Sequence, residues 1–269
     1  MTGARYTHGH HESVLRSHRW RTAANSAAYL VPLLRPGMDV LDVGCGPGTI
    51  TVELARLTAP GRTIGIDAAD EVIEAARALG EDDSPARVEF RTGDVMQLPF
   101  ADGSFDVVHA HQVMQHLADP VGALREMARV CRPGGIVAAR DGDYEAMTWY
   151  PGDTDLDAWL VMYRAVASAN GGEPDAGRYL LHWAHQAGMT DVSASASVWC
   201  FATEEDRNWW GDLWADRVLQ SAIADRALEL GLATREQLAR MSGAWRRWAA
   251  DEDGWFAVLH GEIIATIPP

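Results

Sequence analysis

Three glycines at alternate positions follow a short apolar run, and this turn carries the clearest chemistry in the chain. The run is Val40 to Val43, the glycines are Gly44, Gly46 and Gly48, and a helical pattern follows over 50–57. Glycine tolerates positive φ angles and lets a ligand approach the backbone where a Cβ atom would collide. The first N–H groups of the helix have no partner inside it and can face a ligand. The turn therefore predicts a site for a nucleotide-like cofactor.

The glycine spacing indicates which cofactor. A dinucleotide fingerprint reads G-x-G-x-x-G, whereas here the third glycine comes one place early and Asp42 stands just before the turn. An acid followed by G-x-G-x-G resembles the first motif of the class I S-adenosylmethionine (SAM)-dependent methyltransferases. In that family the loop lies against the methionine part of the cofactor.

Four further segments match the family in order between residues 62 and 139. An apolar strand ends at Asp67, 19 residues after Gly48, where the resemblance implies a carboxylate for both ribose hydroxyls; NAD enzymes share this feature. Gly93-Asp94-Val95 looks like the adenine-binding corner. A strand over 104–111 leads to the turn at 132–135 and a fifth strand over 136–139. Together these matches predict a SAM site, although each alone would be weak.

The resemblance is closest to the ubiquinone/menaquinone-type branch, whose small-molecule members carry an N-terminal helix that folds over the cofactor. A helix is expected over 17–34, with Tyr6 and Arg21 as candidates to cover the methionine end of SAM; the alternative is a terminal tyrosine and a surface arginine. The residues expected to bind SAM are Tyr6, Arg21, Asp42, Gly44, Cys45, Gly46, Asp67, Ala68, Asp94, Val95, His111 and Gln112.

Composition limits the possible partners. The net charge of −15 and the pI near 5.0 disfavour nucleic acid, which requires a basic surface. No run approaches the roughly 18 apolar residues of a membrane span, and the polar start of the chain is unlike a secretory signal. Three widely spaced cysteines indicate a reduced compartment, so a cytoplasmic protein is expected, as a monomer or homodimer.

The pattern of elements predicts an α/β fold. The resemblance implies a Rossmann-like sheet of seven mostly parallel strands, with helices on both faces and an antiparallel last strand inserted beside the fifth. Helices are expected over 157–169 and 177–187, and strands over 193–202 and 255–267. The expected organisation is an N-terminal helical lid (1–36), a SAM-binding core (37–203 and 254–269) and a helical cap (204–253) over the substrate site.

Tryptophan is concentrated outside the cofactor half. Ten of the 11 tryptophans follow residue 148, and Trp209, Trp210, Trp214, Trp245, Trp248 and Trp255 lie in or beside the cap. Large flat aromatic groups suit a pocket for a planar or apolar molecule, although each of them can equally serve as packing between cap and core. The residues expected at the substrate are His10, His11, His116, Tyr144, Trp209, Trp210 and Trp214.

Methyl transfer requires a base only when the nucleophile carries a proton that must leave. The candidates are His116, His111 and Asp143, all near the ends of the fourth and fifth strands; packing at a helix start is the alternative for His116. A metal site at His8 to His11 is not expected, because Cys or Glu partners at ligand spacing are lacking.

The favoured function is SAM-dependent methylation of a small aromatic or apolar natural product, such as an indole or a diketopiperazine. The alternatives are C-methylation of a quinone precursor and a non-catalytic SAM-binding partner protein. The glycine spacing disfavours hydride transfer, and no G-x-S-x-G nucleophile turn of a hydrolase occurs.

Overall fold

Five parallel strands form the half of the sheet that carries the glycine turn in the computed structural model, which describes residues 20–83 and 88–268. They are β1 (Val40–Val43), β2 (Thr63–Asp67), β3 (Val88–Thr92), β4 (Phe105–His111) and β5 (Cys131–Gly142), in the spatial order β3-β2-β1-β4-β5. β1 and β2 are mostly apolar because helices cover both faces of a parallel sheet. Their carboxyl ends meet at one edge, where α/β sheets bind ligands.

The other half of the sheet is antiparallel. β8 (Trp255–Thr266) lies antiparallel beside β5, and β7 (Asp191–Phe201) pairs with its other edge. The expected mixed α/β sheet with its last strand beside the fifth is confirmed. An eighth strand, β6 (Thr148–Tyr150), pairs with the start of β8 and was not expected, because three residues are too few to show a strand period.

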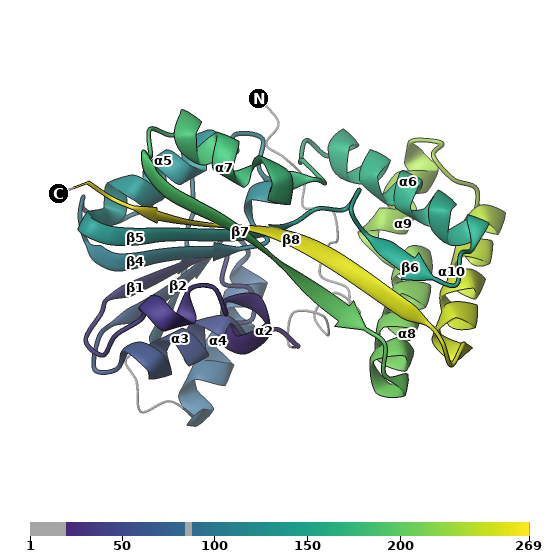
Figure 1. Cartoon of the computed structure of the whole chain (residues 1–269), viewed down its shortest axis with the longest axis horizontal. Coiled ribbons are helices and arrows are strands. Elements are labelled where there is room, and N and C mark those ends of the chain that lie inside the picture. Colours follow the sequence, from purple (N-terminus) through teal and green to yellow (C-terminus); the bar gives the residue numbers. More distant parts are fainter. Residues whose placement is uncertain (1–19, 84–87, 269) are drawn as a thin grey trace.

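Helices cover both faces of the parallel half (Figure 1). α5 (Pro120–Val130) and α7 (Ala176–Gln186) pack on one face, and α3 (Thr49–Thr58) packs on the other with the segment around α2 (Ala23–Ser26). α4 (Asp70–Asp83) lies against β2 and β3. Neighbouring strand residues alternate between the two layers: Val107 contacts the α3 side and Val108 the α5 side.

A second group of helices lies at the far end of β7 and β8, on the right of Figure 1. It consists of α6 (Thr154–Ala169), α8 (Glu204–Gln220), α9 (Ala222–Glu229) and α10 (Arg235–Ala250). The expected helices and strands after residue 150 are therefore present, with ends that match the prediction or differ from it by up to three residues. Trp159, Trp214 and Trp245 are buried together at the centre of this group. No helix within the described ranges is long and apolar enough to cross a membrane.

The expected single helix over 17–34 is wrong for residues 20–34. The structure has α2, a turn over 27–30 and a short 3-10 helix, η1 (Val31–Leu33). Thr22 and Asn25 form a capping box that starts the helix at Ala23. Pro32 lacks an N–H group and disfavours α-helical geometry at the residue before it, so the helix does not continue.

Candidate functional site

A cavity of about 410 Å³ opens at the carboxyl ends of the parallel strands and extends to α6 and α8. Its volume lies within the range typical of small-molecule sites. The predicted residues that it brings together are Arg21, Asp42, Gly44, Cys45, Gly46, Asp67, Ala68, Asp94, Val95, His111, Gln112, His116, Tyr144, Trp209, Trp210 and Trp214. Tyr6, His10 and His11 lie outside the described residues.

The glycine turn has a backbone that side chains would not fit. Gly44, Gly46 and Gly48 have φ angles of 66°, 55° and 87°, a region that glycine adopts without steric cost. A Cβ atom on Gly44 would lie 2.3 Å from Cγ2 of Val113, and one on Gly48 would lie 2.7 Å from the ring of Phe90. The turn therefore brings bare backbone to the cavity just before α3 begins.

Asp67 and Asp42 have different tasks beside this turn. The Asp67 carboxylate accepts hydrogen bonds from the backbone N–H groups of Gly46 (3.1 Å) and Ala69 (3.1 Å), which leaves it half-buried at the edge of the cavity. Asp42 is buried and its two oxygens contact Nδ1 of His109 (2.8 Å) and the hydroxyl of Thr51. Asp42 thus ties β1 to β4 and α3, whereas Asp67 has lone pairs left for a ligand.

The end of β4 is strained. Gln112 has a φ angle of 54° and is the one non-glycine residue with positive φ among the described residues. Such geometry is kept where the surroundings fix it, often at functional sites. Its backbone N–H donates to the Arg140 carbonyl (2.7 Å), and its side-chain nitrogen lies 2.9 Å from Nε2 of His260. These contacts turn the chain into the cavity directly after His111.

His111 is poorly suited to hold a proton. It is buried, and neither ring nitrogen has a hydrogen-bond partner among the described residues. Burial lowers the pKa of His111 well below its usual value, and the charge of Arg140 lowers it further. The ring is therefore neutral at ordinary pH.

Gln115 is a site residue that the sequence did not reveal. Its side-chain nitrogen donates to Oη of Tyr144 (2.9 Å) and lies 3.1 Å from Nε2 of His116, and its side-chain oxygen accepts from the N–H of Gly142 (3.3 Å). Gln115 is buried in the cavity wall and holds two predicted substrate residues together. Only its place beside His116 could have pointed to it.

His116 is a weak base in this setting. The group is half-buried, and desolvation lowers its pKa to about 3, with a smaller effect from the charge of Arg21. Because Nε2 lies beside the Gln115 amide group, a neutral ring that accepts this hydrogen bond fits the contact.

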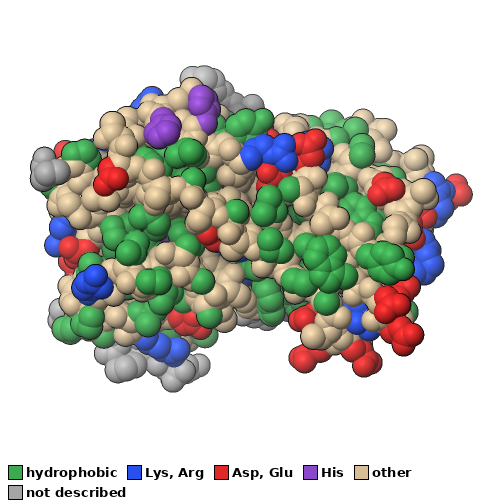
Figure 2. Space-filling model, viewed as in Figure 1, with side chains coloured by type: hydrophobic (Ala, Val, Ile, Leu, Met, Phe, Trp, Pro, Cys, Tyr) green, Lys and Arg blue, Asp and Glu red, His purple; other side chains and the backbone are tan. Residues whose placement is uncertain are grey.

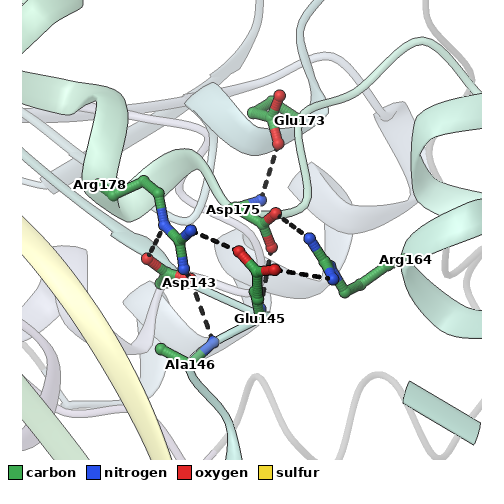
Figure 3. A network of polar contacts seen from close by, with 7 residues as sticks. All are labelled: Asp143, Glu145, Ala146, Arg164, Glu173, Asp175 and Arg178. Carbon is green, nitrogen blue, oxygen red and sulfur yellow. Dashed lines mark hydrogen bonds and ion pairs between the residues drawn. The ribbon is translucent and has the colours of Figure 1, made fainter. Parts of the chain in front are cut away.

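Asp143 does not line the cavity, although it was a catalytic candidate. Both of its carboxylate oxygens contact the guanidinium of Arg178, at 2.6 and 2.7 Å (Figure 3). Glu145 joins Arg178 to Arg164, which in turn binds Asp175. The network connects α6 and α7 to the loop that carries Tyr144, so Asp143 positions this loop and is not placed to contact a substrate.

The tryptophans divide into two groups. Trp209, Trp210 and Trp214 of α8 line the cavity with Trp20 and Trp199. Trp159, Trp245 and Trp248 are buried in the helical core and do not line it, and Trp255 is partly exposed. Spacing along the chain does not separate the two groups, since it does not tell which face of a helix meets the cavity.

Arg217 was also missed. It is buried in the cavity wall, three residues after Trp214 on the same helix, and its guanidinium carbon lies 4.7 Å from the centroid of the Trp214 ring. Side chains three and four residues apart share one face of a helix. Because Trp210 and Trp214 were already predicted to face the substrate, their spacing from Arg217 is the signal that could have revealed it.

The cavity fits SAM at its strand-end side. The backbone of Gly44 and Gly46 lines the cavity without Cβ atoms, Asp67 offers carboxylate lone pairs, and Asp94 stands next to the apolar Val95 just after β3. Arg21 lines the same cavity, with its guanidinium carbon 5.7 Å from the Trp199 ring centroid. A nucleoside with a charged amino-acid tail matches these donors and acceptors.

Comparisons with known proteins agree with this geometry. Residues 34–207 match the family described as methyltransferase domain. An uncharacterized methyltransferase of Schizosaccharomyces pombe is 36% identical over 96% of this chain and 95% of its own length, and the probable methyltransferase ltbC of Aspergillus luteorubrus is 32% identical over 97% and 96%. Demethylmenaquinone methyltransferases also match, over 42% and 40% of this chain.

The fold has solved counterparts as well. The YcgJ protein of Bacillus subtilis superposes with a TM-score of 0.58 over 90% of this chain and 97% of its own, at 21% identity. Fold, glycine turn and sequence relatives lead to one conclusion. The chain belongs to the class I SAM-dependent methyltransferases, is an enzyme, and uses S-adenosyl-L-methionine as its methyl donor.

Proposed function

We propose that the enzyme methylates a small aromatic or apolar natural product in secondary metabolism. The observation that carries this proposal is the wall of the cavity beyond the strand ends, which consists of Tyr144, Met147, Tyr163, Trp199, Trp209, Trp210 and Trp214. Aromatic walls offer flat apolar area and bind planar molecules by offset or edge-to-face stacking. Diketopiperazines that contain an indole are one class of such molecules.

In this proposal the chain is organised around the cavity. Residues 204–253 act as a cap over the acceptor, and residues 1–36 act as a lid over the methionine end of SAM. The described part of the lid contributes Trp20 and Arg21 to the cavity wall, and the cap contributes α8. Both segments would exclude water from the reacting atoms.

Different residues of the cavity would bind the cofactor and position the acceptor. Bound SAM supplies an electrophilic methyl group on its sulfonium. Asp67 and Asp94 would hold the nucleoside, and the turn at Gly44 to Gly48 would lie against the methionine part. Gln115 fixes Tyr144 and His116 at the boundary between the two ends of the cavity, where they would orient the acceptor. Such positioning lowers the barrier of an in-line displacement.

C-methylation of a quinone precursor is the second candidate function. Demethylmenaquinone methyltransferases among the relatives favour it, and a naphthoquinone ring is also flat and apolar. The extra aromatic cap favours the first candidate, since the matches to these enzymes span less than half of this chain.

Methyl transfer from labelled SAM to a panel of acceptors tests the proposal. The panel contains tryptophan-containing diketopiperazines, a dithiol diketopiperazine, simple phenols and a demethylmenaquinone, and the mass and methyl position of each product are determined. Labelled diketopiperazine or phenol supports the first function, and exclusive labelling of the quinone supports the second. Binding of SAM with no transfer to any aromatic acceptor would contradict both.

A further inference from the structure

The outer edge of β7 is a strand edge that the described part of the chain leaves open. β7 pairs with β8 along all 11 of its residues, and no other strand within 20–83 or 88–268 pairs with its opposite side. Residues 193–196, at the middle of the strand, are all exposed. Alternate N–H and C=O groups of an antiparallel strand point away from its partner. The edge therefore presents hydrogen-bonding groups that no described strand uses.

The sequence of β7 has none of the features that usually protect such an edge. Protected edges are short, or carry charged side chains, proline or a β-bulge. Residues 192–201 contain no charged residue and no proline, although the whole chain has a net charge of −15. The pairing with β8 runs from Asp191 to Phe201 without a register shift. β7 is thus a long, regular and uncharged edge.

The other edges of the described sheet, β3 and β6, are protected. β3 has five residues and carries the exposed charges of Glu89 and Arg91. Arg77 of α4 donates from Nε to the Phe90 carbonyl of the same strand at 3.1 Å. β6 has three residues and is followed directly by Pro151. The lack of protection is therefore specific to β7, as expected of an edge that pairs with another strand.

The exposed middle of β7 fits a second copy of the same strand. Two antiparallel edges related by a two-fold axis are self-complementary, because residue i of one copy contacts residue j of the other and j contacts i. Residues 193–196 are alternately serine and alanine, so both faces of the strand carry only small side chains at this point. Two such backbones can approach to the distance of a strand pair without a steric clash between bulky groups.

The charge distribution around β7 also favours an antiparallel pair. α8 begins at Glu204, three residues after β7 ends, and its first turn carries three acids. Figure 2 shows acidic side chains gathered where Figure 1 places the start of that helix. In an antiparallel pair the two acidic groups lie at opposite ends of the interface, whereas a parallel pair would place these like charges side by side.

We propose that two copies of the enzyme form a homodimer in which their β7 strands pair antiparallel around a two-fold axis near residues 193–196. The two sheets then join into one. The inference is independent of the acceptor, because residues 193–196 do not line the cavity. A strand pair buries less area than the roughly 1,600 Å² of a standard protein interface. The dimer is therefore reversible, with a dissociation constant on the order of micromolar.

Sedimentation velocity of the full chain over about 1 to 200 µM tests the inference. We expect the weight-average mass to rise from the 29.4 kDa of one chain toward twice that value. Hydrogen exchange at the two ends of this concentration range gives a local measurement. The outward-facing amides of residues 192–201 should exchange about fivefold more slowly, or slower still, in the dimer, because they then donate across the interface.

Charges at the middle of the strand should break the dimer and restore it. Ala196→Lys places two like charges close to the axis and should raise the dissociation constant at least about tenfold, and Ala196→Glu should do the same. An equimolar mixture of the two variants should dimerise as tightly as the wild-type enzyme or more tightly, because opposite charges then face each other. Unchanged affinity for SAM shows that each variant is folded.

Thr148→Lys is the matched control. It adds the same charge at an exposed position of β6, on another edge of the sheet, and should leave the dissociation constant unchanged. A wild-type enzyme that stays monomeric up to about 200 µM, or a dimer that survives Ala196→Lys, would overturn the inference. Slow exchange of the β7 amides in a monomer would also overturn it, since the edge would then be covered by the same chain.

Discussion

The two ends of the cavity are lined by different kinds of groups. The strand-end side uses backbone geometry and carboxylates: three glycines with positive φ, and the acids Asp67 and Asp94. The α8 side uses large side chains, with Trp209, Trp210 and Trp214 around a buried arginine. The cofactor is the same throughout the family, whereas the acceptor is particular to each enzyme. Backbone groups, which do not change with sequence, suit the shared cofactor. Side chains, which can be exchanged by mutation, suit the variable acceptor.

The largest expected effect concerns the difference between tryptophans that pack in the helical core and tryptophans that line the cavity. Trp245 is completely buried among Trp159, Trp214 and Phe256. We expect Trp245→Ala to lower the free energy of unfolding by about 3–5 kcal/mol, because it leaves a large cavity in the helical core. Urea unfolding measures this change.

The control for that prediction is another tryptophan of the same helical group. Trp209 is half-buried and lines the cavity. Trp209→Ala should cost at most about 1 kcal/mol of stability while it weakens binding of an aromatic acceptor. Equal destabilisation by the two substitutions would show that the cap tryptophans all serve as packing.

The difference between the two ends also explains what could be predicted from the sequence. Gly44 and Asp67, which were predicted to bind the cofactor, line the cavity, and both follow from a backbone constraint that appears at a fixed place in the sequence. Arg217 and Gln115 were missed because a side chain's role depends on which helix face or turn meets the cavity. Asp143, a predicted catalytic candidate, lies outside the cavity lining, and the sequence could not show its partner Arg178, which lies 35 residues away along the chain.

The secondary structure could likewise be predicted only in part from the sequence. The parallel strands were predicted from apolar runs followed by turns, and the helices after residue 150 from their helical period. The break of the N-terminal helix at residues 27–30 was not, because Thr22, Asn25 and Pro32 decide it through capping and a missing N–H group. Apolar spacing at the helical period does not predict where a capping residue or a proline ends the helix.

A loss of cofactor affinity tests the strand-end side. We expect Asp67→Ala to weaken SAM binding by about 1–3 kcal/mol, or about 5- to 150-fold, since ribose hydroxyls and the N–H groups of Gly46 and Ala69 lose their acceptor. Isothermal titration calorimetry measures this. Asp70→Ala, which removes an exposed acid at the start of α4, should leave SAM affinity unchanged. Wild-type affinity in Asp67→Ala would refute the cofactor geometry.

His116 stands at the boundary between the two ends. We expect His116→Ala to lower kcat by about five- to tenfold, the value of one positioning hydrogen bond, because the side-chain nitrogen of Gln115 loses its neighbour. SAM affinity should not change, and neither should the shape of the pH profile of kcat/KM. A drop of about a hundredfold or more, together with the loss of one limb of that profile, would identify His116 as a general base.

The smallest expected effect is a pH dependence of stability at the same residue. An unfolded chain protonates His116 below about pH 6.5, whereas burial lowers its folded pKa to about 3. Unfolding therefore takes up a proton between these values, and acid lowers the free energy of unfolding. A fully buried histidine would contribute about 1.4 kcal/mol per pH unit; because His116 is half-buried, about half of that is expected.

Asp141 acts in the opposite direction, since burial raises its pKa to about 7 and the folded form keeps a proton that the unfolded chain releases above about pH 4. Asp141 is present in both proteins, so its contribution cancels when wild type is compared with His116→Asn. Urea unfolding at pH 7.5, 6.5 and 5.5 should then show the two proteins diverging only below pH 6.5, with the variant losing less stability. Parallel curves down to pH 5.5 would mean that His116 takes up a proton in the folded enzyme, and its place as a neutral orienting group between the two ends would be lost.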